Sequence, residues 1–124
     1  MTYRILSADM VDMIHDDILN PGELTGRAGD KSLDSVLARV ENRLAYGMIS
    51  DVFQLAATYG VVIAQCHFFN DGNKRTAFRS LKICLYLNDV DLDWHTEETG
   101  TLIIRAAQEL ADEEDVAAWL RART

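Results

Sequence analysis

The stretch from position 52 to 66 carries apolar side chains on most of the faces that a helix would present. Its apolar members recur at helical spacing: Val52, Leu55, Ala56, Tyr59, Val62, Ile63 and Cys66. A helix that is apolar on most sides is buried on most sides, so other helices must surround it. The run is too short to cross a bilayer, and Thr58 and Gln65 interrupt it. The sequence therefore predicts an all-α bundle built around this segment.

The patterns in the rest of the chain predict amphipathic helices with local start and stop signals. Residues that can cap a first turn precede four of the helical patterns: Ser7, Ser32, Ser50 or Asp51, and Thr96 or Thr99. Gly47 is placed to end the second helix in a left-handed turn. The acidic cluster at 112–115, followed by Arg121 and Arg123, complements a helix dipole and predicts a last helix rather than a metal site. Apolar and acidic side chains alternate only in the segment 90–94, which favours a short extended piece there. We expect one domain over residues 1–124, a compact bundle of about six helices.

Composition limits the classes of partner. The chain has 12 basic and 20 acidic residues and a formal net charge of -8, so we expect no direct binding to nucleic acid, which requires clustered Lys and Arg. Cys66 and Cys84 each lie in an apolar stretch without metal-ligand spacing, which is typical of buried, reduced thiols. No signal peptide and no membrane-spanning run are visible, so we expect a cytoplasmic protein without a membrane partner.

A polar segment at positions 67–76, HFFNDGNKRT, separates the central helix from the next one. Gly72 permits a tight turn there, and Asp71 or Asn73 can cap the helix that follows. The backbone N–H groups of residues 72–75 would then point outward from a helix N-terminus, which is a binding site for anions. The segment therefore predicts a phosphate site in the loop between two central helices of the bundle.

Four side chains of this segment indicate what the phosphate site does. Lys74 and Arg75 add positive charge in a protein that is otherwise acidic. A carboxylate such as Asp71 belongs beside a phosphate when a divalent cation lies between them, and Mg²⁺ binds through one or two carboxylates plus substrate phosphates. His67 is a side chain that accepts protons near neutral pH. Each residue alone has a structural explanation, as a helix end, a cap or a solvated face. Together they favour phosphoryl or nucleotidyl transfer to a hydroxyl.

The stretch HFFNDGNKRTAF resembles the signature of the Fic/Doc superfamily, H-x-F-x-(D/E)-G-N-x-R. The matching positions are His67, Phe69, Asp71, Gly72, Asn73 and Arg75. Gly26-Arg27 and the segment 33–39 are similar to the loop and second helix of Doc (death-on-curing) proteins. The resemblance covers nearly the whole chain and implies the Fic/Doc fold, with ATP and Mg²⁺ as the cofactors.

The resemblance also implies a role for each residue of the motif. His67 would be the general base that deprotonates the target hydroxyl, and Asp71 would hold Mg²⁺. Phe69 would be a packing anchor for the loop. The residues implied to bind phosphate are Gly72, Asn73, Lys74 and Arg75.

Two departures from the commonest Fic pattern separate kinase from adenylyltransferase. Lys74 stands where typical Fic adenylyltransferases have glycine, and Phe78 stands where they have a second arginine. Doc toxins share the lysine and are associated with transfer of the γ-phosphate of ATP to a threonine of elongation factor Tu, which halts translation. The resemblance thus implies a toxin with kinase activity. AMP transfer is the alternative, and a catalytically inactive binding module is a third interpretation, disfavoured because base and metal residue are both present.

The way this chain would be inhibited is indicated by the absence of the inhibitory motif that many Fic enzymes carry. Many Fic enzymes carry an inhibitory helix with (S/T)-x-x-x-E-(G/N); here the only glutamate followed by Gly or Asn is Glu41, and Leu37 stands where the hydroxyl residue would be. The resemblance therefore implies inhibition in trans by a Phd-like antitoxin, which would fold an amphipathic segment into a groove. The loop at 22–31 would be the flap that aligns the target peptide.

Residues outside the motif receive structural interpretations. We expect His15 and His95 on the surface, because neither has a ligand spacing. We expect Tyr59, Trp94 and Trp119 to be core or interface anchors.

Overall fold

Six α-helices make up the regular structure, as the helical patterns predicted. The computed structural model describes residues 2–29, 32–92 and 94–123, and these ranges contain no β-strand. The helices are α1 (Ala8–Ile18), α2 (Leu33–Ala45), α3 (Val52–Cys66), α4 (Asn73–Leu87), α5 (Thr96–Ala107) and α6 (Glu113–Arg121). The all-α fold class is therefore confirmed.

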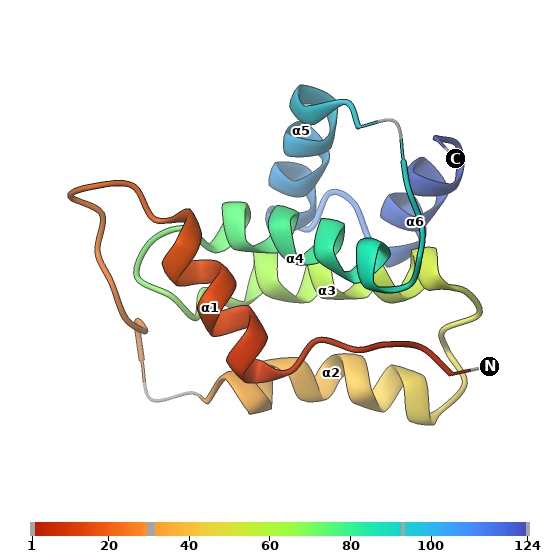
Figure 1. Cartoon of the computed structure of the whole chain (residues 1–124), viewed down its shortest axis with the longest axis horizontal. Helices are drawn as coiled ribbons and strands as arrows, with labels where there is room; N and C mark the ends of the chain where they lie inside the picture. The colour runs from red at the N-terminus through yellow and green to blue at the C-terminus, as the bar shows by residue number, and fades with distance from the viewer. Residues whose placement is uncertain (1, 30–31, 93, 124) are drawn as a thin grey trace.

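Helix α3 is the centre of the bundle. Every residue from Leu55 to Ala64 is buried, and α3 packs against α2, α4, α5 and α6. Figure 1 shows α3 and α4 side by side, α2 along one flank, and α1 crossing α4 at a steep angle. The loop that joins α3 to α4 consequently lies against α1, which brings two distant parts of the chain to one place.

Most helix starts obey the expected local chemistry. The side chains of Ser7, Ser32 and Asp51 accept the backbone N–H three residues further on. Asp112 and Asp115 form a reciprocal capping box at the start of α6. Gly47 follows α2 with a φ of 68°, in the left-handed conformation predicted for it. These caps depend on residues that are neighbours in the chain, which explains why the sequence predicts them.

Asp51 has a second function, because it also binds the last helix. Its carboxylate accepts the Gln54 N–H at 2.9 Å and pairs with Arg121, whose Nε lies 2.7 Å from Oδ2. Burial by itself would raise the pKa of Asp51, but Arg121 and the Gln54 N–H outweigh it and hold that pKa below its usual range. Asp51 thus joins the start of α3 to the end of α6.

We expect Asp51→Ala to lower the free energy of unfolding by about 1–2 kcal/mol, the sum of a lost N-cap and a half-exposed ion pair. Urea denaturation at neutral pH measures this difference, and Arg121→Ala, which keeps the cap, is the matched control with the smaller loss. A carboxyl whose pKa is lowered by folding stabilises the protein above its unfolded pKa, and this stabilisation is lost as the pH falls through the folded pKa. The penalty of Asp51→Ala should therefore shrink below about pH 4. An equal penalty in acid would contradict the assignment.

Two local expectations fail. Neither Thr96 nor Thr99 caps α5: the N-cap position belongs to His95, and α5 begins at Thr96 itself. The segment at 90–94 forms no strand within its described residues, and Asp93 lies outside them. One alternating segment has no partner strand with which to pair. Leu92 is instead buried in the core, and Val90 and Trp94 pack against it partly buried.

The expected aromatic anchors differ in depth. Tyr59 is fully buried, and its hydroxyl bonds to the N–H and carbonyl of Leu6 at 2.9 and 3.2 Å, which ties the N-terminal segment to α3. Burial raises the pKa of Tyr59 to about 12. Trp94 and Trp119 are half-buried against the core.

Among the described helices, none has the length and apolarity needed to cross a bilayer.

Candidate active site

The segment between α3 and α4 begins at His67, where α3 ends. The backbone of His67 is left-handed, with φ 49° and ψ 33°. This conformation is uncommon for a residue other than glycine, and such residues concentrate at functional sites. The turn directs the chain out of the buried helix and leaves His67 exposed at the edge of a cleft. The imidazole is therefore accessible to a hydroxyl group that docks from solvent.

Asn73 holds the site loop, defined as residues 67–72, in its shape. Its Oδ1 accepts the Phe69 N–H at 3.0 Å, and its Nδ2 donates to the Phe69 carbonyl at 2.9 Å. The Phe69 side chain is only 2% exposed, so it anchors the loop in the core. Because the Asn73 amide is engaged in this way, its contact to a phosphate would come from its backbone N–H.

The start of α4 differs from the expectation that Asp71 or Asn73 would cap it. The N-cap is Gly72, with φ 83° and no side-chain hydrogen bond to the first turn. The left-handed φ favours glycine at position 72, and a Cβ there would lie 2.9 Å from Cδ1 of Ile18 in α1, so this side-chain end would have to shift. Because no side chain caps the turn, the N–H groups of residues 73–75 remain available to an anion.

Asp71 is held at both its backbone and its side chain. Its carbonyl oxygen accepts from His15 Nε2 at 2.7 Å, and its Oδ2 accepts from the Leu24 N–H at 2.8 Å. No group of three or more metal-ligating side chains occurs in the described part of the chain. A cation bound to Asp71 would therefore complete its coordination with water and substrate phosphates. Mg²⁺ binds in this way, so the residues present fit the metal that the sequence predicts.

The loop at 20–29 lies directly against the site loop. Arg27 and Phe69 form an isolated antiparallel bridge, and the Asn70 N–H donates to the Gly26 carbonyl at 3.0 Å. The Asn70 side chain donates to the Thr25 carbonyl at 2.9 Å. The predicted flap at 22–31 is thus next to the site as far as residue 29, and residues 30 and 31 lie outside the described ranges.

Arg75 is directed toward α1 and the 20–29 loop. One of its terminal nitrogens donates to the Ile18 carbonyl at 2.9 Å, and the other pairs with the carboxylate of Glu23. The Arg75 guanidinium, helped by the Asn20 N–H, holds the pKa of Glu23 below its usual range. The arginine that was predicted to bind phosphate is therefore bound to a carboxylate of its own chain in this structure.

The predicted site residues line one cleft of about 300 Å³. The cleft brings together all six of them: His67, Asp71, Gly72, Asn73, Lys74 and Arg75. A larger groove of about 690 Å³ adjoins it, because Lys74 and Arg75 line both. A ligand whose charged end lies in the cleft can therefore extend into the groove.

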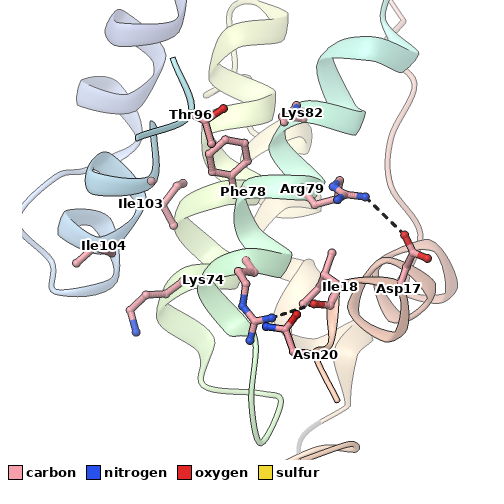
Figure 2. Close-up of a pocket in the computed structure, with 12 residues that line it drawn as sticks. Asp17, Ile18, Asn20, Lys74, Phe78, Arg79, Lys82, Thr96, Ile103 and Ile104 are labelled. Carbon is pink, nitrogen blue, oxygen red and sulfur yellow. Dashed lines mark hydrogen bonds and ion pairs between the residues drawn. The ribbon is translucent and has the colours of Figure 1, made fainter. Parts of the chain in front are cut away.

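The groove runs between α4, α5 and the end of α1 (Figure 2). Its lining combines the apolar side chains of Phe78, Ile103 and Ile104 with the cations of α4 and with Asp17. Among these, Lys82 lies 5.7 Å from the centre of the Phe78 ring, and Arg79 pairs with Asp17 at 3.6 Å. The groove thus combines an apolar part with more cations than carboxylates, in a chain with a net charge of -8.

Sequence reasoning missed two residues of this site. His15 was expected on the surface, but it is only 1% exposed and touches Asp71. Its spacing of four residues from the buried Val11 places it on the apolar face of α1, and this was the signal available. Glu23 carried no signal, because its pairing with Arg75 depends on where the 20–29 loop lies relative to the start of α4. His95 is exposed, as predicted.

Two comparisons place the chain among known proteins. The model of the Fic/DOC family matches residues 5–85. A protein of Escherichia phage P1, protein kinase doc, is 35% identical to this chain over 119 residues, which cover 95% of the chain and 94% of the phage protein. Both matches include the site loop and the start of α4.

Proposed function

The chain belongs to the Fic/DOC family, and from this premise we propose that it is a protein kinase that transfers the γ-phosphate of ATP to a threonine hydroxyl of elongation factor Tu. It acts as the toxin of a toxin–antitoxin pair by blocking translation. One observation carries the proposal: a single cleft is lined by an exposed imidazole, a carboxylate and an uncapped helix N-terminus. The similarity to a phage protein kinase supports phosphoryl transfer as the reaction.

In the proposed reaction, the threonine oxygen attacks the γ-phosphorus of ATP. The hydroxyl proton passes to the imidazole of His67, and the bond from the γ-phosphorus to the bridging oxygen breaks, so that ADP leaves. His67 suits this role because it lies at the edge of the cleft, exposed to an incoming protein surface.

The phosphates are assigned to the start of α4. The N–H groups of residues 73–75 and the charges of Lys74 and Arg75 all lie at this helix end, which favours anions. Asp71 would hold Mg²⁺, which neutralises charge that develops on the phosphates during transfer. The hydrogen bond from His15 holds the Asp71 backbone, and the one from the Leu24 N–H holds its carboxylate, so this carboxylate stays at the edge of the cleft.

Because Glu23 is bound to Arg75, a phosphate must compete with this carboxylate for the guanidinium. We therefore expect Glu23→Gln to tighten ATP binding by about twofold to fivefold, the range expected for a partly exposed ion pair. Isothermal titration calorimetry with Mg²⁺ and ATP measures the change, and Glu97→Gln, an exposed glutamate of α5, is the control. Weaker binding would mean that Glu23 orients Arg75 for the phosphate instead of competing with it.

AMP transfer is the alternative reaction, supported by Gly72 and Asn73, which keep the broader Fic pattern. Phe78 counts against it, because it presents a ring to the groove where adenylyltransferases have a second arginine. A catalytically inactive binding module is disfavoured, because His67 and Asp71 line the same cleft.

Inhibition in trans is part of the proposal. The described chain has a groove beside the cleft that is lined by apolar side chains and by cations of α4 (Figure 2). An acidic amphipathic segment of a Phd-like antitoxin matches both features, since its apolar face would cover Phe78 and the exposed Ile104 while its acids face Lys82. Expression of the chain alone should arrest bacterial growth, and co-expression of the antitoxin should relieve the arrest.

Position-labelled ATP separates the two reactions. Purified elongation factor Tu is incubated with the chain, Mg²⁺ and ATP labelled in either the γ- or the α-phosphate. The kinase proposal expects label in the protein only from the γ-position. Label from the α-position would instead establish AMP transfer.

A further inference from the structure

His15 is a buried polar group in a helix that the motif does not include. Its side chain is within α1 and only 1% exposed, and its Nε2 lies 2.7 Å from the carbonyl oxygen of Asp71. A carbonyl oxygen only accepts hydrogen bonds, so Nε2 carries a proton and donates it. A buried donor is costly to leave unpaired, which makes this contact a fixed feature of the fold.

The imidazole also stacks on the site loop. Its ring lies parallel to the Phe69 ring, with the centroids 3.7 Å apart and an angle of 6° between the planes. Phe69 is the residue whose backbone Asn73 clamps. His15 therefore touches the site loop at two points, one on each side of Asn70.

These contacts determine where the Asp71 carboxylate lies. The next residue, Gly72, has no side chain that could anchor the turn, so the Asp71 backbone depends on His15 and its carboxylate on the Leu24 N–H. Loss of the His15 donor would remove the hydrogen bond to the Asp71 carbonyl and leave the Leu24 N–H to hold this residue.

We propose that His15 is a positioning residue that holds Asp71 in place for Mg²⁺; the metal part of this inference rests on the function proposed above. His15 touches neither the phosphates nor the hydroxyl in this arrangement. It acts through the backbone of Asp71, in the way that outer groups orient metal ligands in other proteins.

Two substitutions separate the hydrogen bond from packing. His15→Gln keeps a donor of similar reach, and His15→Phe keeps a flat ring for Phe69 but has no donor. Val11→Ala, one turn earlier on the same buried face of α1, is the control for general loosening of the helix. Thermal unfolding identifies any variant that has lost the fold.

Hydrogen exchange of the Phe69 and Asn70 amides, which are hydrogen-bonded to Asn73 and Gly26, tests the placement without nucleotide or metal. We expect His15→Phe to speed this exchange at least tenfold, while His15→Gln stays within about threefold of the unsubstituted protein. Val11→Ala should speed exchange in α1 more than in the site loop. Unchanged site-loop exchange in a folded His15→Phe protein would overturn the inference.

Transfer of phosphate to elongation factor Tu then tests the link to the metal. We expect the Mg²⁺ concentration for half-maximal rate to rise about tenfold to a hundredfold in His15→Phe and to recover in His15→Gln. ATP affinity measured without Mg²⁺ should stay the same. A rate loss with unchanged Mg²⁺ dependence would overturn the positioning role. If the unsubstituted protein shows no transfer while the exchange results hold, the proposed function fails and the placement of Asp71 stands.

Discussion

His67→Ala is expected to lower the rate of phosphate transfer by about 10²- to 10⁴-fold, the usual contribution of a general base. The alanine cannot take the proton of the attacking hydroxyl, but the phosphate cradle at the start of α4 is unchanged. Affinity for ATP should therefore stay close to that of the unsubstituted protein. Steady-state rates with elongation factor Tu, together with calorimetry for ATP, separate the two effects.

The same change should leave the fold intact, because the His67 side chain is exposed. We expect the free energy of unfolding to change by less than about 0.5 kcal/mol. His95→Ala is the matched control, since it removes another exposed histidine, at the start of α5. A His67→Ala protein that keeps more than a tenth of the rate would show that the base lies elsewhere.

Asp71→Asn is the second change with a large expected effect. Asparagine keeps the volume and an oxygen that can accept the Leu24 N–H, but it removes the negative charge that Mg²⁺ needs. Several kcal/mol of charge stabilisation depend on such a metal, so we expect the rate to fall by about 10²-fold or more. Removal of Mg²⁺ by a chelator should lower the rate of the unsubstituted protein by a similar factor.

Calorimetry at several Mg²⁺ concentrations checks this assignment directly. ATP should bind the unsubstituted protein more tightly as Mg²⁺ rises, and this dependence should largely disappear in Asp71→Asn. Asp91→Asn removes the same charge at an exposed position far from the motif in the chain and should behave like the unsubstituted protein. If Asp71→Asn keeps the full Mg²⁺ dependence, another group holds the metal.

The sequence predicted those parts of the molecule that depend on neighbouring residues. Ser7, Ser32 and Asp51 cap helices through bonds to residues three positions away, so a local pattern is sufficient. The site loop is also contiguous, which explains why the residues of its cleft can be read from one segment. The start of α4 was the exception: Gly72 takes the cap position because the chain turns there with a φ of 83°, a conformation that favours glycine.

The remaining features arise from contacts between distant segments. His15 reaches Asp71 across 56 positions of the chain, and Glu23 reaches Arg75 across 52. Both contacts depend on α1 crossing the start of α4 (Figure 1). A single sequence gives helical faces but not the angle at which two helices cross, so neither partner was predictable. The side-chain direction of Asn73 is a local feature instead, because both its hydrogen bonds go to the backbone of Phe69, four residues earlier.

The mass of intact elongation factor Tu, after incubation with this chain, Mg²⁺ and ATP, tests the central claim most directly. We predict a gain of about 80 Da, the mass of one phosphoryl group, that is absent with His67→Ala. A gain of about 329 Da, the mass of one AMP group, would contradict the kinase assignment in favour of AMP transfer. An unchanged mass would contradict elongation factor Tu as the substrate.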